Sequence, residues 1–257
     1  MLKLAMTGDE KKIDEFCRPF ALGARIRCAT LAYGLSSLLV SVWLGEENGK
    51  ITAAVSLFDG AVTVLADDNA DFSELSQFLS RLSFSSLCGE EETVNKLGFA
   101  ADYQKNMFEY TAPIPLPYEK ADGENENYPA VYDLISRSIP GSFSADREAY
   151  LCWLSDFTYR RRRNLARLMT VSESENLLSC ALTAAECQDC AIISGVACDE
   201  KARGKHLGQR TVRTLCDELM NEGKRVYVIA LNDAASSFYL KTGFTFIGKV
   251  SYIERTN

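Results

Sequence analysis

Runs of apolar residues separated by polar turns predict strands and amphipathic helices over most of the chain. The run at 194–198 is short and apolar, which is typical of a buried strand. The segment after it carries Val212, Leu215 and Leu219 at helical spacing and therefore predicts a helix with one apolar face. The apolar run at 225–231 predicts another strand. This order of strand, helix and strand indicates an α/β (α+β) fold.

The residues before this segment predict the remaining elements of the same half. Polar turns at 172–176 and 186–189 separate apolar runs that are rich in strand-forming residues. Helices are expected at 128–138 and 145–159, and strands at 167–171, 177–183 and 190–198.

The first half of the chain repeats this order in a shorter form. A helix is expected at about 72–82, followed by the segment 94–99, which matches 239–244 in ending with Lys-x-Gly-Phe. Strands joined by turns are expected before that helix, at 40–45, 50–58 and 61–66. We therefore predict two halves of related fold.

A glycine-containing basic loop lies between the strand at 194–198 and the helix that follows it. The loop reads Arg-Gly-Lys-His-Leu-Gly at 203–208. The first amides of a helix have no acceptor within the helix, and together with the helix dipole they favour a bound anion. The loop therefore predicts a site for a pyrophosphate group.

The loop, the helix, the next strand and the segment 232–244 together resemble the GNAT superfamily of acyl-CoA-dependent N-acyltransferases. The loop corresponds to the family's Q/R-x-x-G-x-G/A motif, and 232–244 corresponds to its Asn…Phe-Tyr-x-x-x-Gly-Phe segment. The resemblance extends from near Tyr128 to the end of the chain. It departs from the family pattern at His206, where the family has Gly, and at Cys198, where it has Val. The resemblance implies the GNAT fold, with a mixed central sheet flanked by helices, in two GNAT-like halves.

The resemblance also implies roles for residues of the second half. Backbone groups of Val196, Ala197 and Cys198 would hold the pantetheine arm and the thioester oxygen. Tyr239 would be the general acid, because a phenol with a pKa near ~10 can protonate a CoA thiolate with a pKa near ~8.5. Asn232 would be a polar contact on the cofactor side. The pyrophosphate would be bound by Arg203, Gly204, Lys205, His206, Leu207 and Gly208.

The sequence does not identify the general base that would deprotonate the amine. The strand residues at 191–194 include no carboxylate. Glu173, Glu175 and Glu186 lie in nearby turns and are interpreted as solvated charges, so a chain of water molecules is the preferred proton route. The arginine run at 160–163 is interpreted as the solvated end of a helix.

The loop of the first half has a composition unsuited to an anion. It carries Asp67, Asp68 and Asp71 where a pyrophosphate would need positive charge and free amides. We therefore expect a degenerate GNAT-like domain at 1–112, a Pro-rich and charged linker at 113–127, and a catalytic GNAT acetyltransferase domain at 128–257.

The net charge and the cysteine content limit the classes of binding partner and the cellular compartment that we expect. The net charge of −7 argues against nucleic acid as a partner and favours a cationic amine. The nine cysteines lack the spacing of a disulfide framework, and no signal peptide is recognised, so a cytoplasmic protein is expected. Cys187 and Cys190 have zinc-ligand spacing but no second pair, so no metal is expected. The uncharged run at 28–45 is interpreted as the end of a buried helix followed by a strand, and not as a membrane span.

The expected function is N-acyl transfer from acetyl-CoA to a primary amine by direct attack in a ternary complex. The acceptor would be a small-molecule amine or a peptide N-terminus. The alternative is a protein that binds CoA as a sensor or scaffold without turnover. The sequence leaves the acceptor, the acyl-chain preference and the oligomeric state open.

Overall fold

The computed structural model describes residues 1–111, 120–123, 126–139, 143–144 and 146–255. It divides into two compact units. The first comprises Met1–Met107, Ala230–Asn232 and Ile247–Asn257, and the second comprises Phe108–Ile229 and Asp233–Phe246. The linker expected at 113–127 lies mostly outside the described residues. Of its described part, Asp122 and Gly123 exchange backbone hydrogen bonds with Thr170.

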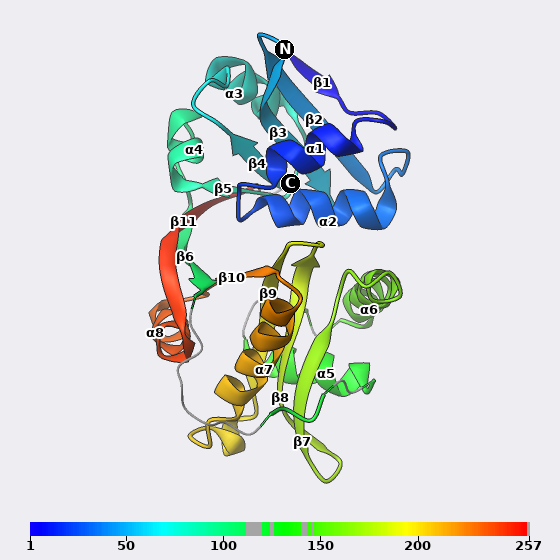
Figure 1. The fold of residues 1–257 in the computed structure, drawn as a ribbon, viewed down its shortest axis with the longest axis vertical. Helices are drawn as coiled ribbons and strands as arrows, with labels where there is room; N and C mark the ends of the chain where they lie inside the picture. Colours follow the sequence, from blue (N-terminus) through cyan, green and yellow to red (C-terminus); the bar gives the residue numbers. More distant parts are fainter. Residues whose placement is uncertain (112–119, 124–125, 140–142, 145, 256–257) are drawn as a thin grey trace. The chain divides into compact units, whose positions relative to one another are not determined.

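The first unit is a mixed sheet with helices, ordered β1-β2-β3-β4-β5-β11 (Figure 1). The strands predicted at 40–45, 50–58 and 61–66 and the helix predicted at 72–82 are confirmed. The uncharged run at 28–45 is the end of one helix, a connection and most of a strand, as predicted. The elements are β1 (Leu2–Leu4), α1 (Glu10–Cys17), α2 (Gly23–Tyr33), β2 (Val40–Glu47), β3 (Lys50–Phe58), β4 (Ala61–Ala66), α3 (Phe72–Arg81), β5 (Ser86–Glu90) and α4 (Glu91–Lys96).

Alternation along β3 and β4 explains the core of this unit. Val55 and Val64 face each other across the antiparallel pair and are fully buried. Leu75 and Leu79, one helical turn apart on α3, pack into the same cluster. Every second residue of the two strands and every fourth residue of the helix therefore contribute to one apolar core.

The last described strand of the chain, β11 (Phe244–Glu254), supplies the strand next to β5 in this sheet. It pairs antiparallel with β5, from Val250 opposite Glu90 to Glu254 opposite Ser86. The strand begins in the second unit, and its residues from Ile247 onward group with the first. β6 (Tyr103–Tyr110) is likewise divided, at Met107 and Phe108.

The second unit has the strand order β6-β10-β9-β8-β7 (Figure 1). β7, β8 and β9 are antiparallel neighbours, whereas β9 and β10 run parallel with α7 as the crossover. The helices and strands predicted for this half are confirmed. The elements are α5 (Tyr128–Ser138), α6 (Arg147–Arg161), β7 (Leu168–Glu173), β8 (Asn176–Glu186), β9 (Cys190–Cys198), the 3₁₀ turn η1 (Glu200–Ala202), α7 (Leu207–Asn221), β10 (Arg225–Ile229) and α8 (Asp233–Thr242).

Successive residues of β8 face opposite sides of this sheet. Cys180 and Leu182 pack with α5 in one apolar cluster. The hydroxyl of Ser179 accepts a hydrogen bond from Thr211 of α7 at 2.9 Å. The apolar face predicted for α7 is confirmed, since Val212, Leu215 and Leu219 have no exposed surface. None of the helices in the described part of the chain is long and apolar enough to cross a membrane.

Candidate active site

Two parallel strands separate at the centre of the second unit. The pairing of β9 with β10 starts at Cys190 opposite Arg225 and ends at Ile193 opposite Val228. β9 nevertheless continues to Cys198, so its last residues have no β10 partner. Backbone groups on that side of 194–198 are available to a bound chain, in the manner of an added strand. This stretch contains Val196, Ala197 and Cys198.

A bulge turns β9 at the point where the strands separate. Leu182 pairs with Ser194 and Cys180 pairs with Ala197, so β9 has one residue more than β8 across this interval. Gly195 has φ +56°, and an added Cβ would lie 3.0 Å from Ile135 Cδ1 and from the side chain of Leu182. Glycine is therefore required both by the backbone and by the close packing of α5.

The start of α7 is open to an anion. His206, the N-cap residue, makes no side-chain cap, and the ring Nδ1 lies 2.8 Å from Gln209 Oε1 instead. The amides of Leu207, Gly208 and Gln209 belong to the first turn, where no intrahelical acceptor exists. Arg203 and Lys205 are exposed beside them. The backbone amides and the two cations form the donor set that a pyrophosphate requires.

The loop geometry explains how His206 fits a position where the family has glycine. His206 has φ +59°, in the left-handed region that glycine adopts most easily, so the histidine fits a glycine position at a modest cost. Cys198 is half-buried at the end of β9. Burial raises the pKa of its thiol, while Arg203 and the N–H of Gly208 act in the opposite direction. Both residues therefore border the open helix end.

Tyr239 lies on α8 within an aromatic cluster. Its side chain is 6% exposed, and its ring centroid lies 5.3 Å from those of Phe238 and Phe244 and 6.3 Å from that of Phe108. Burial, with a smaller contribution from Cys216, raises the pKa of the phenol. The hydroxyl is therefore protonated at neutral pH, the form that a proton donor needs. Asn232 is exposed in the bend between β10 and α8.

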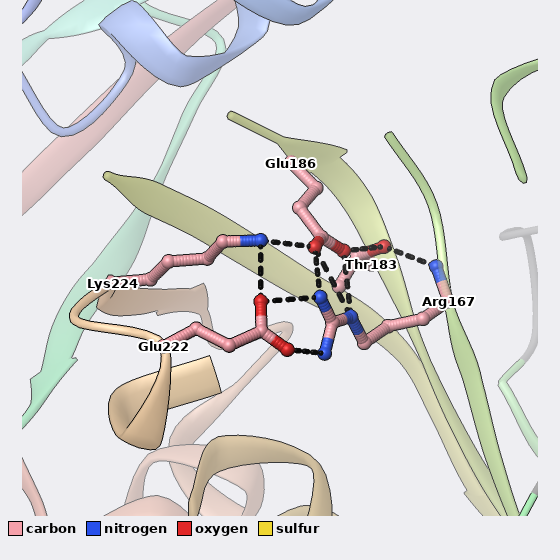
Figure 2. Close-up of polar contacts among 5 residues, drawn as sticks. All are labelled: Arg167, Thr183, Glu186, Glu222 and Lys224. Atoms are coloured by element: carbon pink, nitrogen blue, oxygen red, sulfur yellow. Dashed lines mark hydrogen bonds and ion pairs between the residues drawn. The ribbon is translucent and has the colours of Figure 1, made fainter. Parts of the chain in front are cut away.

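The interpretation of Glu186 as a solvated charge is wrong. Its side chain is 1% exposed and accepts hydrogen bonds from Lys224 Nζ at 2.6 Å and Arg167 Nε at 3.1 Å (Figure 2). Thr183 Oγ1 donates to it at 3.3 Å, and Glu222 binds the same two cations. Glu186 therefore joins β7, β8 and the end of α7. Glu173 and Glu175 are exposed at the tip of the β7–β8 hairpin, as expected.

Part of the arginine run is also structural. Arg160 is 7% exposed, and it donates to Asp156 Oδ2 at 2.7 Å and to the carbonyl of Ala184 at 3.0 Å. Arg161 donates to the hydroxyl of Tyr128, and Arg163 lies over the ring of Tyr159 at 3.6 Å. The prediction of a solvated helix end is wrong for Arg160.

Comparison with known proteins connects this geometry to a family. The model of the acetyltransferase (GNAT) family matches residues 128–244. Residues 128–244 form a GNAT-family domain. They contain β7, β8, β9 and β10, as well as the open end of α7 and Tyr239, and they end at the first residue of β11. β6 precedes them. The GNAT family and fold support acyl transfer as the general activity.

Solved structures of GNAT proteins share the fold over the whole chain. An acetyltransferase of the GNAT family from Colwellia psychrerythraea matches with a TM-score of 0.59, 12% identity and full coverage of both chains. A tandem GNAT protein of the clavulanic acid biosynthesis pathway matches with a TM-score of 0.61, 12% identity and full coverage of both chains. A GCN5-related N-acetyltransferase from Sphaerobacter thermophilus matches with a TM-score of 0.62 and 12% identity, covering 98% of this chain and 94% of that one. No curated protein sequence matches the chain.

The bulge at Gly195 was missed by the sequence analysis, although a signal for it exists. A glycine inside a strand pattern indicates a bulge or a close approach of the backbone. The contact of the Cys198 thiol with the N–H of Gly208 had no such signal, because it depends on how the loop folds back onto β9.

Proposed function

We propose that this protein transfers the acetyl group of acetyl-CoA to a primary amine by direct attack within a ternary complex. The observation that carries the proposal is the continuity of two features: the unpartnered end of β9, and the uncapped start of α7 that follows it. An extended pantetheine arm can pair with the first while a pyrophosphate binds at the second.

The donor set of the second unit fits this co-substrate. Gly204 has φ +81° with no heavy atom within 4 Å of an added Cβ, so the loop backbone is accessible. An added Cβ at Gly208 would meet only the ring of Phe238, at 3.7 Å. Backbone groups of Val196, Ala197 and Cys198 would bind pantetheine, and Arg203 and Lys205 would balance the phosphate charge. Asn232 would be a further polar contact to the cofactor.

Tyr239 is the proposed general acid. When the amine nitrogen forms its bond to the acetyl carbon, the carbon–sulfur bond breaks and the electron pair leaves on the CoA sulfur. Tyr239 would donate its proton to that thiolate. Its raised pKa keeps the proton in place before the reaction. Because Glu186 is fully engaged by Arg167 and Lys224, a water chain remains the proposed route from the amine.

We propose that the first half is a degenerate domain at 1–112. In its loop, carboxylates of the chain itself accept the backbone hydrogen bonds that a bound anion would otherwise accept. Asp71 Oδ1 accepts from the amide of Glu74 at 2.9 Å at the start of α3, and Asp67 Oδ1 accepts from the amide of Asn69 at 2.8 Å. Lys96 pairs with Asp68 at 2.6 Å. These contacts support a structural role for this half. In the proposed arrangement the acyltransferase domain is 128–257, the linker is 113–127, and the protein is cytoplasmic.

The test is thiol release from acetyl-CoA by the full chain with polyamines, aminoglycosides, amino acids and peptides as acceptors. We expect amine-dependent release of CoA thiol, with the acetylated amine identified by mass spectrometry. Tight acetyl-CoA binding without release for any acceptor would instead support the sensor or scaffold function.

A further inference from the structure

A cavity of 510 Å³ lies in the second unit, between α5, the tip of the β7–β8 hairpin and the loop after β9. Its volume lies within the range of small-molecule sites, which is about 300–1,000 Å³. Ala130, Leu177 and Ala202 give it an apolar floor, and the last two are 9% and 3% exposed. The cavity is built from three separate elements of the unit.

Charges of both signs line this cavity without neutralising one another. Arg137 and Asp199 form an ion pair of 2.7 Å and satisfy each other. The remaining charges are Glu173 and Glu175 on the hairpin and Lys201 and Lys205 on the loop. None of these four forms an ion pair with any residue in the described part of the chain. Two carboxylates and two ammonium groups thus face one space from different elements.

We propose that this cavity binds a small amphoteric molecule of the amino-acid type. Its ammonium group would lie at Glu173 and Glu175, and its carboxylate would lie at Lys201 and Lys205. The apolar floor would contact the hydrocarbon that joins the two groups. A ligand with one charge would satisfy one side of the cavity and be repelled or unsupported by the other, so the arrangement selects for both charges.

The cavity is linked to the proposed acetyl-CoA site through Lys205. This lysine lines the cavity and also belongs to the loop assigned to the pyrophosphate. A ligand carboxylate at Lys205 would reduce the positive charge available to the phosphates and so lower the affinity for acetyl-CoA. Bound acetyl-CoA would lower the affinity for the ligand by the same factor. This part of the inference rests on the proposed function, whereas binding in the cavity does not.

The test is a titration of the full chain with ω-amino acids from glycine to 6-aminohexanoate, followed by ligand-observed NMR. Alkylamines and alkyl carboxylates of equal length are the single-charge probes. We expect an optimum chain length, and an affinity for each single-charge probe lower by roughly fivefold or more. Glu173→Gln/Glu175→Gln and, separately, Lys201→Gln should each lower amino-acid affinity to a similar extent. Glu148→Gln, an exposed change on α6 away from the cavity, should leave the affinity unchanged.

Binding of no ω-amino acid, or equal binding of the single-charge probes, would overturn the proposal. So would unchanged affinity in both the Glu173→Gln/Glu175→Gln and the Lys201→Gln variants, with folding checked by circular dichroism. Gly208→Asp separates this inference from the proposed function, because it should remove acetyl-CoA binding and retain amino-acid binding. For the link between the sites, saturation with the best amino acid should raise the acetyl-CoA Kd severalfold. An unchanged Kd would overturn the link.

Discussion

Glycine at position 208 leaves the first turn of α7 accessible to an anion. A side chain can be added there, since the nearest atoms to a new Cβ are those of the Phe238 ring at 3.7 Å. An aspartate in the first turn suits the helix dipole but repels a phosphate. This position therefore separates helix stability from anion binding.

Gly208→Asp should lower the affinity for acetyl-CoA by at least roughly tenfold, with no loss of thermal stability. Gly208→Asn is the matched control, because it adds the same volume without the charge. Isothermal titration calorimetry and thermal unfolding give the two readouts. Equal acetyl-CoA affinity in the Asp and Asn variants would contradict an anion site at α7.

Tyr239→Phe should lower kcat by about 10²–10⁴-fold with little change in acetyl-CoA affinity, because it removes the proton and keeps the packed ring. Tyr110→Phe is the matched control. It removes a hydroxyl that donates to Asp217 at 2.9 Å in the same aromatic region, and should affect stability more than rate. Parental turnover by Tyr239→Phe on a verified amine would limit Tyr239 to a structural role.

At the scale of elements, the starts of α3 and α7 differ in how their amides are satisfied. Asp71 caps α3, and no side chain caps α7. The composition of the first loop predicted that its carboxylates disfavour an anion, but it did not predict that Asp71 caps α3. Local patterns also predicted β3, β4 and the buried face of α7, because in each element the spacing of apolar residues along the sequence decides which side chains are buried.

Long-range contacts were beyond the reach of those patterns. Glu186 was interpreted as solvated because its cations, Arg167 and Lys224, lie far from it in the sequence. Arg160 was misjudged for a similar reason, since the carbonyl of Ala184 that it binds belongs to another element. A charged residue can be recognised as buried only when its partners are known.

The ion-pair network that joins β7, β8 and α7 should make stability depend on pH. Hydrogen bonding from Arg167, followed by Lys224, lowers the pKa of Glu222 to about 2 from 4.5. A carboxylate with a depressed folded pKa stabilises above its unfolded pKa and loses that effect as pH falls from about 4.5 toward 2. The contribution is modest, because Glu222 is 46% exposed.

Glu222→Gln should therefore be less stable than the parent at neutral pH, by about 0–1 kcal/mol, with the difference shrinking below pH ~4.5. Urea unfolding at a series of pH values measures this. Glu148→Gln, an exposed change away from the network, is the control. A difference between Glu222→Gln and the parent that stayed constant down to low pH would contradict the assignment.

For the whole molecule, the two halves should differ in ligand binding. We expect one acetyl-CoA per chain by calorimetry, and at least roughly tenfold weaker binding in Gly208→Asp. Asp71→Ala should cost about 0.5–2 kcal/mol of stability through loss of the α3 cap, and should leave acetyl-CoA affinity unchanged. A second binding event in the parent, or binding in Gly208→Asp as tight as in the parent, would contradict a degenerate first half.

The pairing of β11 with β5 has a consequence for the order in which the chain can fold. β5 is translated early, whereas β11 follows every helix and strand of the second unit. The side of β5 that pairs with β11 therefore stays unpaired until the ribosome has completed the rest of the chain. Because exposed strand edges promote association between chains, newly made protein should be most prone to aggregate during this interval.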